Sequence, residues 1–275
     1  MAAPSRKTDL DDPLWETIRD EVAQDAQMEP ILASFLHATI LKHETLEDAL
    51  SFHLAGKLAT ATLPAMLIRE VIEEALTSDA GIQKAVRADI HAVRDRDPAT
   101  TRYSLPLLYY KGFHALESYR VAHWIWNKGR ESLAFYLQNR ISEVFAVDIH
   151  PAARIGMGIL IDHGTSVVIG ETAVVEDNVS MLHEVTLGGT GKQTGDRHPK
   201  VRHGVLIGTG AKILGNVEIG AGAKIAAGSV VLKDVPPHST VAGVPAVVVG
   251  RPEVEEPALD MDQTLPDAHV GGSGI

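Results

Sequence analysis

The stretch that decides the fold is residues 149–187, IHPAARIGMGILIDHGTSVVIGETAVVEDNVSMLHEVTL, where an aliphatic residue returns at six-residue intervals broken by one slip. The same repeat continues over residues 207–231. The aliphatic positions are Ile149, Ile155, Ile161, Ile169, Val175, Met181, Leu187, Ile207, Ile213, Ile219, Ile225 and Val231. Helices repeat near 3.6 residues and strands near 2, so neither explains this period. A hexapeptide repeat predicts a parallel β-helix, in which three short strands form a triangular coil of about eighteen residues.

Two interruptions break this period. Ile161 and Ile169 are eight residues apart, which is a slip of two. Ile207 follows Leu187 by twenty residues, one coil plus two, and GGTGKQTGDRHPKVRHGVL lies between them. These polar and glycine residues cannot all face an apolar interior. We therefore predict that residues 188–204 form an extruded loop, and long loops on a regular scaffold are where function tends to lie.

The rest of the chain divides by composition. Residues 1–143 carry apolar residues at three-to-four spacing, which predicts an α-helical domain. Residues 144–250 hold the repeat, and residues 251–275 are polar and Gly-rich towards their end, so we expect a flexible C-terminal tail. The predicted fold class is α+β multidomain, with an N-terminal all-α domain followed by a β-helix.

The composition excludes several function classes. The chain has 275 residues and a net charge of −11, which argues against binding to nucleic acid or to an anionic membrane. It has no cysteine, so a disulfide, a thiolate nucleophile and a Cys-ligated metal are excluded. The N-terminal sequence MAAPSRKTDLDDP has no apolar segment, and we expect neither secretion nor membrane insertion but a cytoplasmic location.

Four motifs lie in and around the repeat. They are DIHPAA from Asp148, the pair Asp162–His163, VTLGGTGK over residues 185–192 and GDRHPK over residues 195–200. Together with the helical segments ASFLHATILKHETLEDAL and RDPATTRYSLPLLYYKGFHALESYR, they make the chain resemble the serine O-acetyltransferase family over nearly its whole length. The resemblance implies that the β-helix is left-handed. It also implies trimers along the β-helix, paired through the helical domains into a hexamer.

This resemblance implies an acetyltransferase that moves the acetyl group of acetyl-CoA to the hydroxyl of L-serine. The products are O-acetyl-L-serine and CoA, in the first step of cysteine biosynthesis. A hydroxyl needs a base at neutral pH, and histidine, with a pKa near 6.5, suits that role. His163 lies at the first slip and matches the family's catalytic base, while Asp148 matches the carboxylate that orients it. Fifteen residues separate the two, and we expect them on neighbouring levels of the β-helix.

The remaining site residues are also implied by the resemblance. Asp97 and Asp162 are expected to bind the ammonium group of serine, and Arg197 and His198 its carboxylate. A planar guanidinium matches a carboxylate well. The candidate CoA-binding residues are Gly188, Gly189, Gly208, Lys224, Ala227 and Lys233. No metal and no permanently bound cofactor are expected, since acetyl-CoA is a co-substrate.

Two partners follow from the resemblance as well. L-cysteine is expected to act as a feedback inhibitor at the serine site. The C-terminal residue Ile275 is expected to insert into O-acetylserine sulfhydrylase, the next enzyme in cysteine synthesis.

Three other functions stay open on the sequence. The acceptor of a hexapeptide acetyltransferase can instead be a sugar or another hydroxyl compound. A zinc hydrase of the hexapeptide type would use histidines such as His198 and His203, although both flank or occupy the predicted loop. A non-catalytic scaffold would use only its tail.

Overall fold

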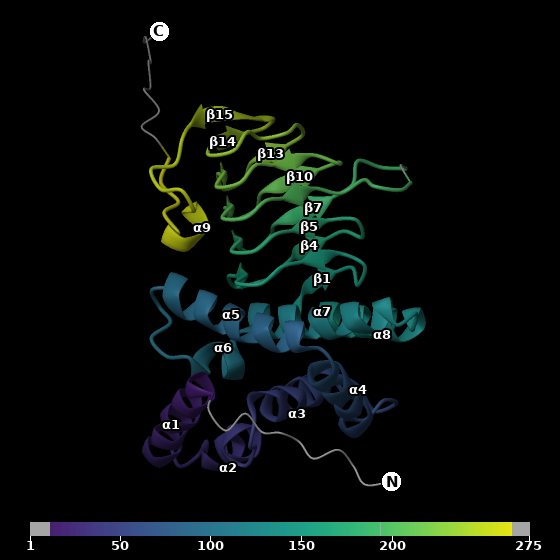
Figure 1. The fold of residues 1–275 in the computed structure, drawn as a ribbon, viewed down its shortest axis with the longest axis vertical. Helices are drawn as coiled ribbons and strands as arrows, with labels where there is room; N and C mark the ends of the chain where they lie inside the picture. The colour runs from purple at the N-terminus through teal and green to yellow at the C-terminus, as the bar shows by residue number, and fades with distance from the viewer. Residues whose placement is uncertain (1–11, 193, 266–275) are drawn as a thin grey trace.

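A computed structural model describes residues 12–192 and 194–265. Helices come first in the chain and stacked strands follow, so the helices form one end of an elongated molecule and the coils the other (Figure 1). The helical elements before the coils are α1 (Pro13–Met28), α2 (Ala33–Leu36), the π-helix η1 (His37–Leu41), α3 (Leu46–Leu58), α4 (Ala65–Ser78), α5 (Ala80–Arg96), α6 (Ser104–Tyr109), α7 (Lys111–Asn127) and α8 (Glu131–Phe145).

Short parallel strands then form three sheets. Sheet A contains β1 (Val147–Ile149), β4 (Val167–Ile169), β7 (Thr186–Gly188), β10 (Lys212–Leu214) and β13 (Val230–Val231). Sheet B contains β2 (Arg154–Ile155), β5 (Val174–Val175), β8 (Lys200–Val201) and β11 (Glu218–Ile219). Sheet C contains β3 (Leu160–Ile161), β6 (Ser180–Met181), β9 (Leu206–Ile207), β12 (Lys224–Ile225), β14 (Thr240–Gly243) and β15 (Ala246–Gly250). The last pair, β14 and β15, is antiparallel, as expected for a chain that folds back after the coils.

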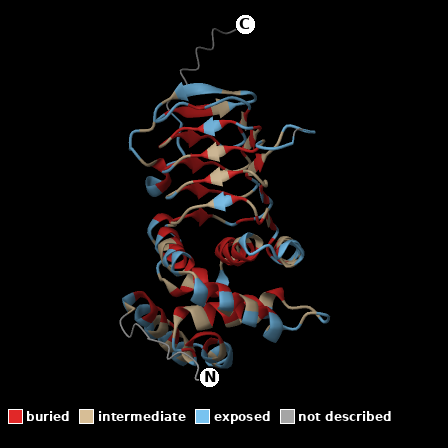
Figure 2. Ribbon diagram, turned by 45° about the vertical axis from the view of Figure 1, so that its right-hand side comes forward, coloured by how far each residue is buried: buried red, intermediate tan, exposed pale blue. Residues whose placement is uncertain are grey.

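The predicted β-helix is confirmed. Figure 2 shows buried residues in the stacked coils. The repeat aliphatic residues are at most 5% exposed, apart from the half-buried Ile155. Each stacks on its equivalent one coil away, as Ile169 does on Leu187. Burial of these side chains is the main favourable term in the stability of the coils, and each is worth about 1.5–3 kcal/mol.

The two interruptions have distinct structural causes. Ile149 pairs with Ile169, twenty residues on, so the first coil holds two residues more than the next one. They lie between Ile161 and Val168, which are seven residues apart, whereas their partners Met181 and Thr186 are five apart. Val175 pairs with Val201, twenty-six residues on, so the second interruption adds eight residues and not two. The predicted loop 188–204 is also too long, because Lys200–Val201 form β8 and Val201 is fully buried.

The segment after the coils is packed and not free over its described part. Residues 251–265 run back along sheet C, where α9 (Pro257–Asp260) contacts α5 and β9 (Figure 1). Ala258 is fully buried, and the Ser180 hydroxyl donates to its carbonyl oxygen at 2.8 Å. The structure therefore packs residues 251–265 against the coils and α5, and the rest of the predicted tail lies outside the described residues. Within the described ranges no helix is both long and apolar enough to cross a membrane.

Candidate functional site

Three stacks of turns connect the sheets and hold the candidate residues. The CA corner comprises the turns from sheet C to sheet A, at residues 162–166, 182–185, 208–211 and 226–229. The AB corner comprises those from sheet A to sheet B, at residues 150–153, 170–173, 189–199 and 215–217. The BC corner comprises those from sheet B to sheet C, at residues 156–159, 176–179, 202–205 and 220–223. The CA and AB corners are therefore the two edges of sheet A.

Asp162 and His163 lie at the CA corner, in the turn that contains the two additional residues. His163 has a φ of 57° and its side chain is 73% exposed, so the tight turn holds the imidazole outside the coil. Its Nε2 atom lies 3.8 Å from Oδ2 of Asp162. The ring of His183, one coil further on, meets the His163 ring edge-on at 5.7 Å between centroids. A base in this position is open to an incoming substrate.

Two carboxylates at this corner influence each other. Burial raises the pKa of Asp162, the nearby His163 lowers it, and the negative charge of Asp97 raises it further. Asp97 follows the last residue of α5 and accepts hydrogen bonds from the Ala99 amide at 2.8 Å and the Thr100 hydroxyl at 2.6 Å. The structure therefore brings Asp97, Asp162 and His163 together, and two acidic groups beside each other favour a cationic ligand such as an ammonium group.

Arg197 and His198 lie instead at the AB corner. His198 is buried, and its Nδ1 atom accepts a hydrogen bond from the Thr172 amide at 3.2 Å. Burial lowers the pKa of His198, and the charge of Arg197 lowers it further. The guanidinium of Arg197 donates to Glu171 at 2.6 Å. Glu171 and Thr172 are not among the predicted site residues, although they follow the repeat position Ile169 by two and three residues.

The position of the His198 ring also explains why residue 170 is a glycine. A Cβ atom at Gly170 would lie 2.0 Å from Cδ2 of His198, so only glycine leaves room for the imidazole at that place.

Asp148 does not contact His163 within one chain. It lies on β1, on the outer face of sheet A, and accepts a hydrogen bond from Gln138 Nε2 at 2.7 Å. Among the described residues, the hydrogen bonds and ion pairs of His163 do not include Asp148. The expectation that the two lie on neighbouring levels did not take into account that they lie on different sides of the coil.

The candidate CoA-binding residues are divided in the same way. Gly208 and Ala227 lie at the CA corner, where a Cβ atom at Gly208 would lie 2.6 Å from the Ala227 amide nitrogen. Gly188 ends β7, and Gly189 begins the extruded part of the AB corner. A Cβ atom placed on Gly189 would lie 3.6 Å from His198 Nε2. Lys233 is exposed just after β13.

Lys224 is neither solvated nor open to a ligand. It lies on the outer face of sheet C, is 5% exposed, and its Nζ atom donates to Asp262 Oδ2 at 3.1 Å and to the Thr264 carbonyl at 2.5 Å. The packed part of the tail thus accepts the hydrogen bonds of this ammonium group.

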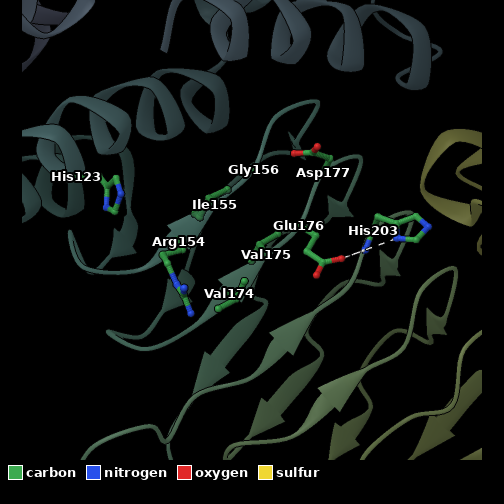
Figure 3. Close-up of a pocket in the computed structure, with 9 residues that line it drawn as sticks. All are labelled: His123, Arg154, Ile155, Gly156, Val174, Val175, Glu176, Asp177 and His203. Carbon is green, nitrogen blue, oxygen red and sulfur yellow. Dashed lines mark hydrogen bonds and ion pairs between the residues drawn. The ribbon is translucent and has the colours of Figure 1, made fainter. Parts of the chain in front are cut away.

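The two histidines that would suit a zinc hydrase are not brought together. His203 lies at the BC corner, where its Nδ1 atom is 3.9 Å from Glu176, whereas His198 is at the AB corner. Beside His203, a hollow of about 560 Å³ lies over sheet B and is also lined by His123, Arg154 and Asp177 (Figure 3). None of the candidate serine-binding or catalytic residues lines it.

Comparison with known proteins agrees with this architecture. The family model described as serine acetyltransferase, N-terminal, matches residues 14–118, and the bacterial transferase hexapeptide model matches residues 198–233. A serine acetyltransferase from Salmonella typhimurium is 60% identical over 93% of this chain and 94% of its own length. The crystal structure of serine acetyltransferase from Vibrio cholerae has a TM-score of 0.90 and 63% identity, covering 91% of this chain and 97% of that one.

Related structures carry ligands. A serine acetyltransferase in complex with cysteine has a TM-score of 0.90 and 58% identity, over 92% of this chain and 98% of that one. The Brucella abortus enzyme in complex with coenzyme A has a TM-score of 0.86 and 53% identity, over 88% and 96%. The soybean enzyme complexed with serine has a TM-score of 0.85 and 57% identity, over 86% and 97%. On this identity and coverage, the chain belongs to the serine acetyltransferase family.

Proposed function

We propose that this chain transfers the acetyl group of acetyl-CoA to the hydroxyl of L-serine, with His163 as the general base, at a site shared by two copies of the chain. Its membership of the serine acetyltransferase family, at 60% identity to a curated relative, supports the reaction. The complexes of related enzymes with serine and with coenzyme A support the two substrates. A sugar acceptor is not favoured by any of these relatives.

The observation that supports a shared site is that the candidate residues lie at two different edges of sheet A. Asp97, Asp162 and His163 lie along one edge of sheet A, and Arg197 and His198 lie along the other. One serine cannot place its ammonium group at one edge and its carboxylate at the other edge of the same coil. If the CA corner of one copy faces the AB corner of a neighbour, both groups are bound in one crevice. The candidate CoA residues at these corners then line the same crevice.

Sheet A is also the face that suits contact with another copy. On sheet C, α5 and the tail lie against β3, β9 and β12, and the exposed valines of β15 lie at the end of the coils, beyond the candidate residues. The outer face of sheet B carries charged residues such as Arg154 and Glu218. Sheet A lies between the two corners that hold the candidate residues, exposes Val168 (38%) and carries Leu232 (50%) just beyond β13. Three copies packed through this face would form a closed ring with three equivalent sites.

A second contact would join two trimers into a hexamer. At the far end of the molecule, α1 and the segment after it expose Met28 (67%), Ile31 (88%) and Phe35 (37%). This apolar group in the helical region, predicted as residues 1–143, suits the dimer of trimers that we propose.

The proposed chemistry needs one base and no covalent intermediate on the protein. His163 removes the proton from the serine hydroxyl while the oxygen attacks the thioester carbonyl, forming a tetrahedral intermediate. The intermediate collapses, the carbon–sulfur bond breaks, and the imidazolium returns its proton to the CoA thiolate. Asp148, which lies on the sheet that faces the neighbour, would stabilise the imidazolium from across the contact. L-cysteine, which differs from serine only in a thiol for a hydroxyl, would compete for the same crevice.

Two further proposals concern the setting of the enzyme. We place it in the cytoplasm, in agreement with its acetyl-CoA substrate. We also propose that Ile275, which lies outside the described residues, binds O-acetylserine sulfhydrylase.

Replacing His163 by alanine tests the mechanism. We expect turnover to fall by two to four orders of magnitude, the usual range for a lost general base, with assembly unchanged. His203→Ala removes an exposed histidine at another corner and is the matched control. A loss below about tenfold in a correctly assembled His163→Ala enzyme would exclude His163 as the base, since it lies well below that range.

A further inference from the structure

Arg96 is a buried arginine that the proposed chemistry does not use. It is the last residue of α5 and directly precedes Asp97. Only 8% of it is exposed, and burial lowers the pKa of its guanidinium to about 10, while the nearby charges of Asp89 and Glu256 oppose this shift. Burying a charged group is unfavourable unless it is paired and hydrogen-bonded. The contacts of Arg96 therefore need an explanation.

The guanidinium of Arg96 connects α5 directly to the second coil and, through that coil, to the tail. Nη1 donates to the Ser180 hydroxyl at 3.0 Å, and Nη2 donates to Asn178 Oδ1 at 3.4 Å. Both partners belong to the second coil of the β-helix. Ser180 in turn donates to the Ala258 carbonyl at 2.8 Å, and Asn178 Nδ2 donates to Glu256 at 3.4 Å. The end of α5, the second coil and the packed tail thus share one hydrogen-bond network.

This network lies one residue away from the candidate serine-binding carboxylate. Asp97 is the C-cap of α5, and its amide donates to the Val93 carbonyl at 3.1 Å, so the position of its side chain depends on where the last turn of α5 lies. The carboxylate must also remain close to Asp162, whose pKa it raises. A helix end free to shift would separate the two carboxylates.

We propose that Arg96 is a positioning residue for serine binding: it ties the C-terminal end of α5 to the second coil and to the tail segment at residues 256–258, and so fixes Asp97 beside Asp162. The inference rests on the proposed serine site. It assigns no chemical step to Arg96, and it gives the packed part of the tail a role at the substrate. The expected signature is a change in serine binding without a matching change in the chemical step.

Steady-state kinetics of the full-length enzyme test this role. Arg96→Met is expected to raise KM for serine by about tenfold, the effect of weakening one charge-assisted hydrogen bond, with kcat and KM for acetyl-CoA little changed. Ser180→Ala removes only the hydroxyl between Arg96 and the tail, and should raise KM for serine in the same direction. Arg96→Lys, which keeps the charge, should restore part of the loss. Arg94→Met, on the same helix with its guanidinium over Tyr103, is the control.

Asp97→Asn distinguishes a failure of the role inferred for Arg96 from a failure of the proposed serine site. If it raises KM for serine while Arg96→Met and Ser180→Ala do not, Arg96 does not position Asp97 and the inference fails alone. If Asp97→Asn leaves KM for serine unchanged, the proposed serine site fails and the inference with it. A parallel fall of kcat, of affinity for both substrates and of thermal stability would show a merely structural role. If Arg96→Met does not fold, Ser180→Ala decides the question.

Discussion

Replacing Glu117 by glutamine is expected to change how the stability of the protein depends on pH. Glu117 lies on α7, is 1% exposed, and its carboxyl oxygens accept no hydrogen bond from a donor group among the described residues, while the Asp89 carboxylate lies beside it as an acceptor. Arg120 Nε is 3.5 Å away. Asp89, in contrast, accepts hydrogen bonds from the Ile159 amide at 2.7 Å and from Arg120 at 3.0 and 2.5 Å. Burial raises the pKa of both carboxyls, but Asp89 is the better-stabilised anion, so we expect a proton held by this pair to lie on Glu117.

The pKa of Glu117 fixes the direction of the effect. Burial, and next the negative charge of Asp89, raise this pKa well above its usual 4.5. As pH rises above that value, the unfolded chain releases the proton and the folded protein keeps it. The free energy of unfolding of the wild type therefore falls with rising pH, by about 1.4 kcal/mol per pH unit from this group, until the folded carboxyl also titrates. Glutamine has nearly the same shape and no proton to release, so this fall is absent from the variant.

Urea unfolding at pH 5, 6, 7 and 8, at one protein concentration, measures the difference. The stability of Glu117→Gln relative to wild type should rise by about 1.4 kcal/mol per pH unit over the titration window. Glu70→Gln, an exposed position on α4, is the control and should show no such trend. A difference between Glu117→Gln and wild type that stays constant from pH 5 to pH 8 would refute the assignment of a proton to Glu117.

Three further changes test the packing and the tail. Gly112→Ala places a Cβ atom 2.1 Å from the Ile161 carbonyl oxygen, beside Asp162, so α7 or the turn at residues 162–166 must move. We expect a loss of about 1–3 kcal/mol in thermal or urea unfolding and, if His163 is the proposed base, a large loss of kcat. Gly56→Ala, where a Cβ atom would meet no atom of the described residues within 4 Å, should instead stabilise α3 by up to about 1 kcal/mol, and equal behaviour of the two variants would contradict the packing argument. Removal of residues 266–275 should leave acetyl transfer intact and abolish binding to O-acetylserine sulfhydrylase, and retained binding in a pull-down would exclude Ile275 as the contact.

The sequence predicts the coils well because their interior depends on a strict period. A slip of two residues at Ile161 was enough to indicate an unusual turn, and that turn contains His163. The length of the second interruption was wrong because Val201, a repeat position inside a polar segment, was not recognised as a strand residue. A periodic pattern reveals a strand through its apolar side chains. The two-residue strand β8, beside the charged loop, contains only one of them, Val201.

The packing of the tail and the placement of the candidate residues at two different corners could not be predicted from the period. Residues 251–265 bury Pro257 and Ala258 and make polar contacts such as Lys224 with Asp262 and Ser180 with Ala258. A polar composition does not distinguish such a segment from a free one. The placement of Arg197 at a different corner from His163 depends on how the loop returns to the coil, which spacing alone does not fix.

Mixing two inactive variants tests the shared site most directly. His163→Ala keeps the AB corner intact, and Arg197→Ala keeps the CA corner intact. If each site joins the CA corner of one copy to the AB corner of its neighbour, random assembly of a 1:1 mixture makes one half times one half, about one quarter, of the sites fully intact. Co-expression or refolding of the mixture should therefore restore about a quarter of wild-type turnover. Activity no higher than the mean of the separate variants, in mixed oligomers verified by mass, would show that one copy holds the whole site.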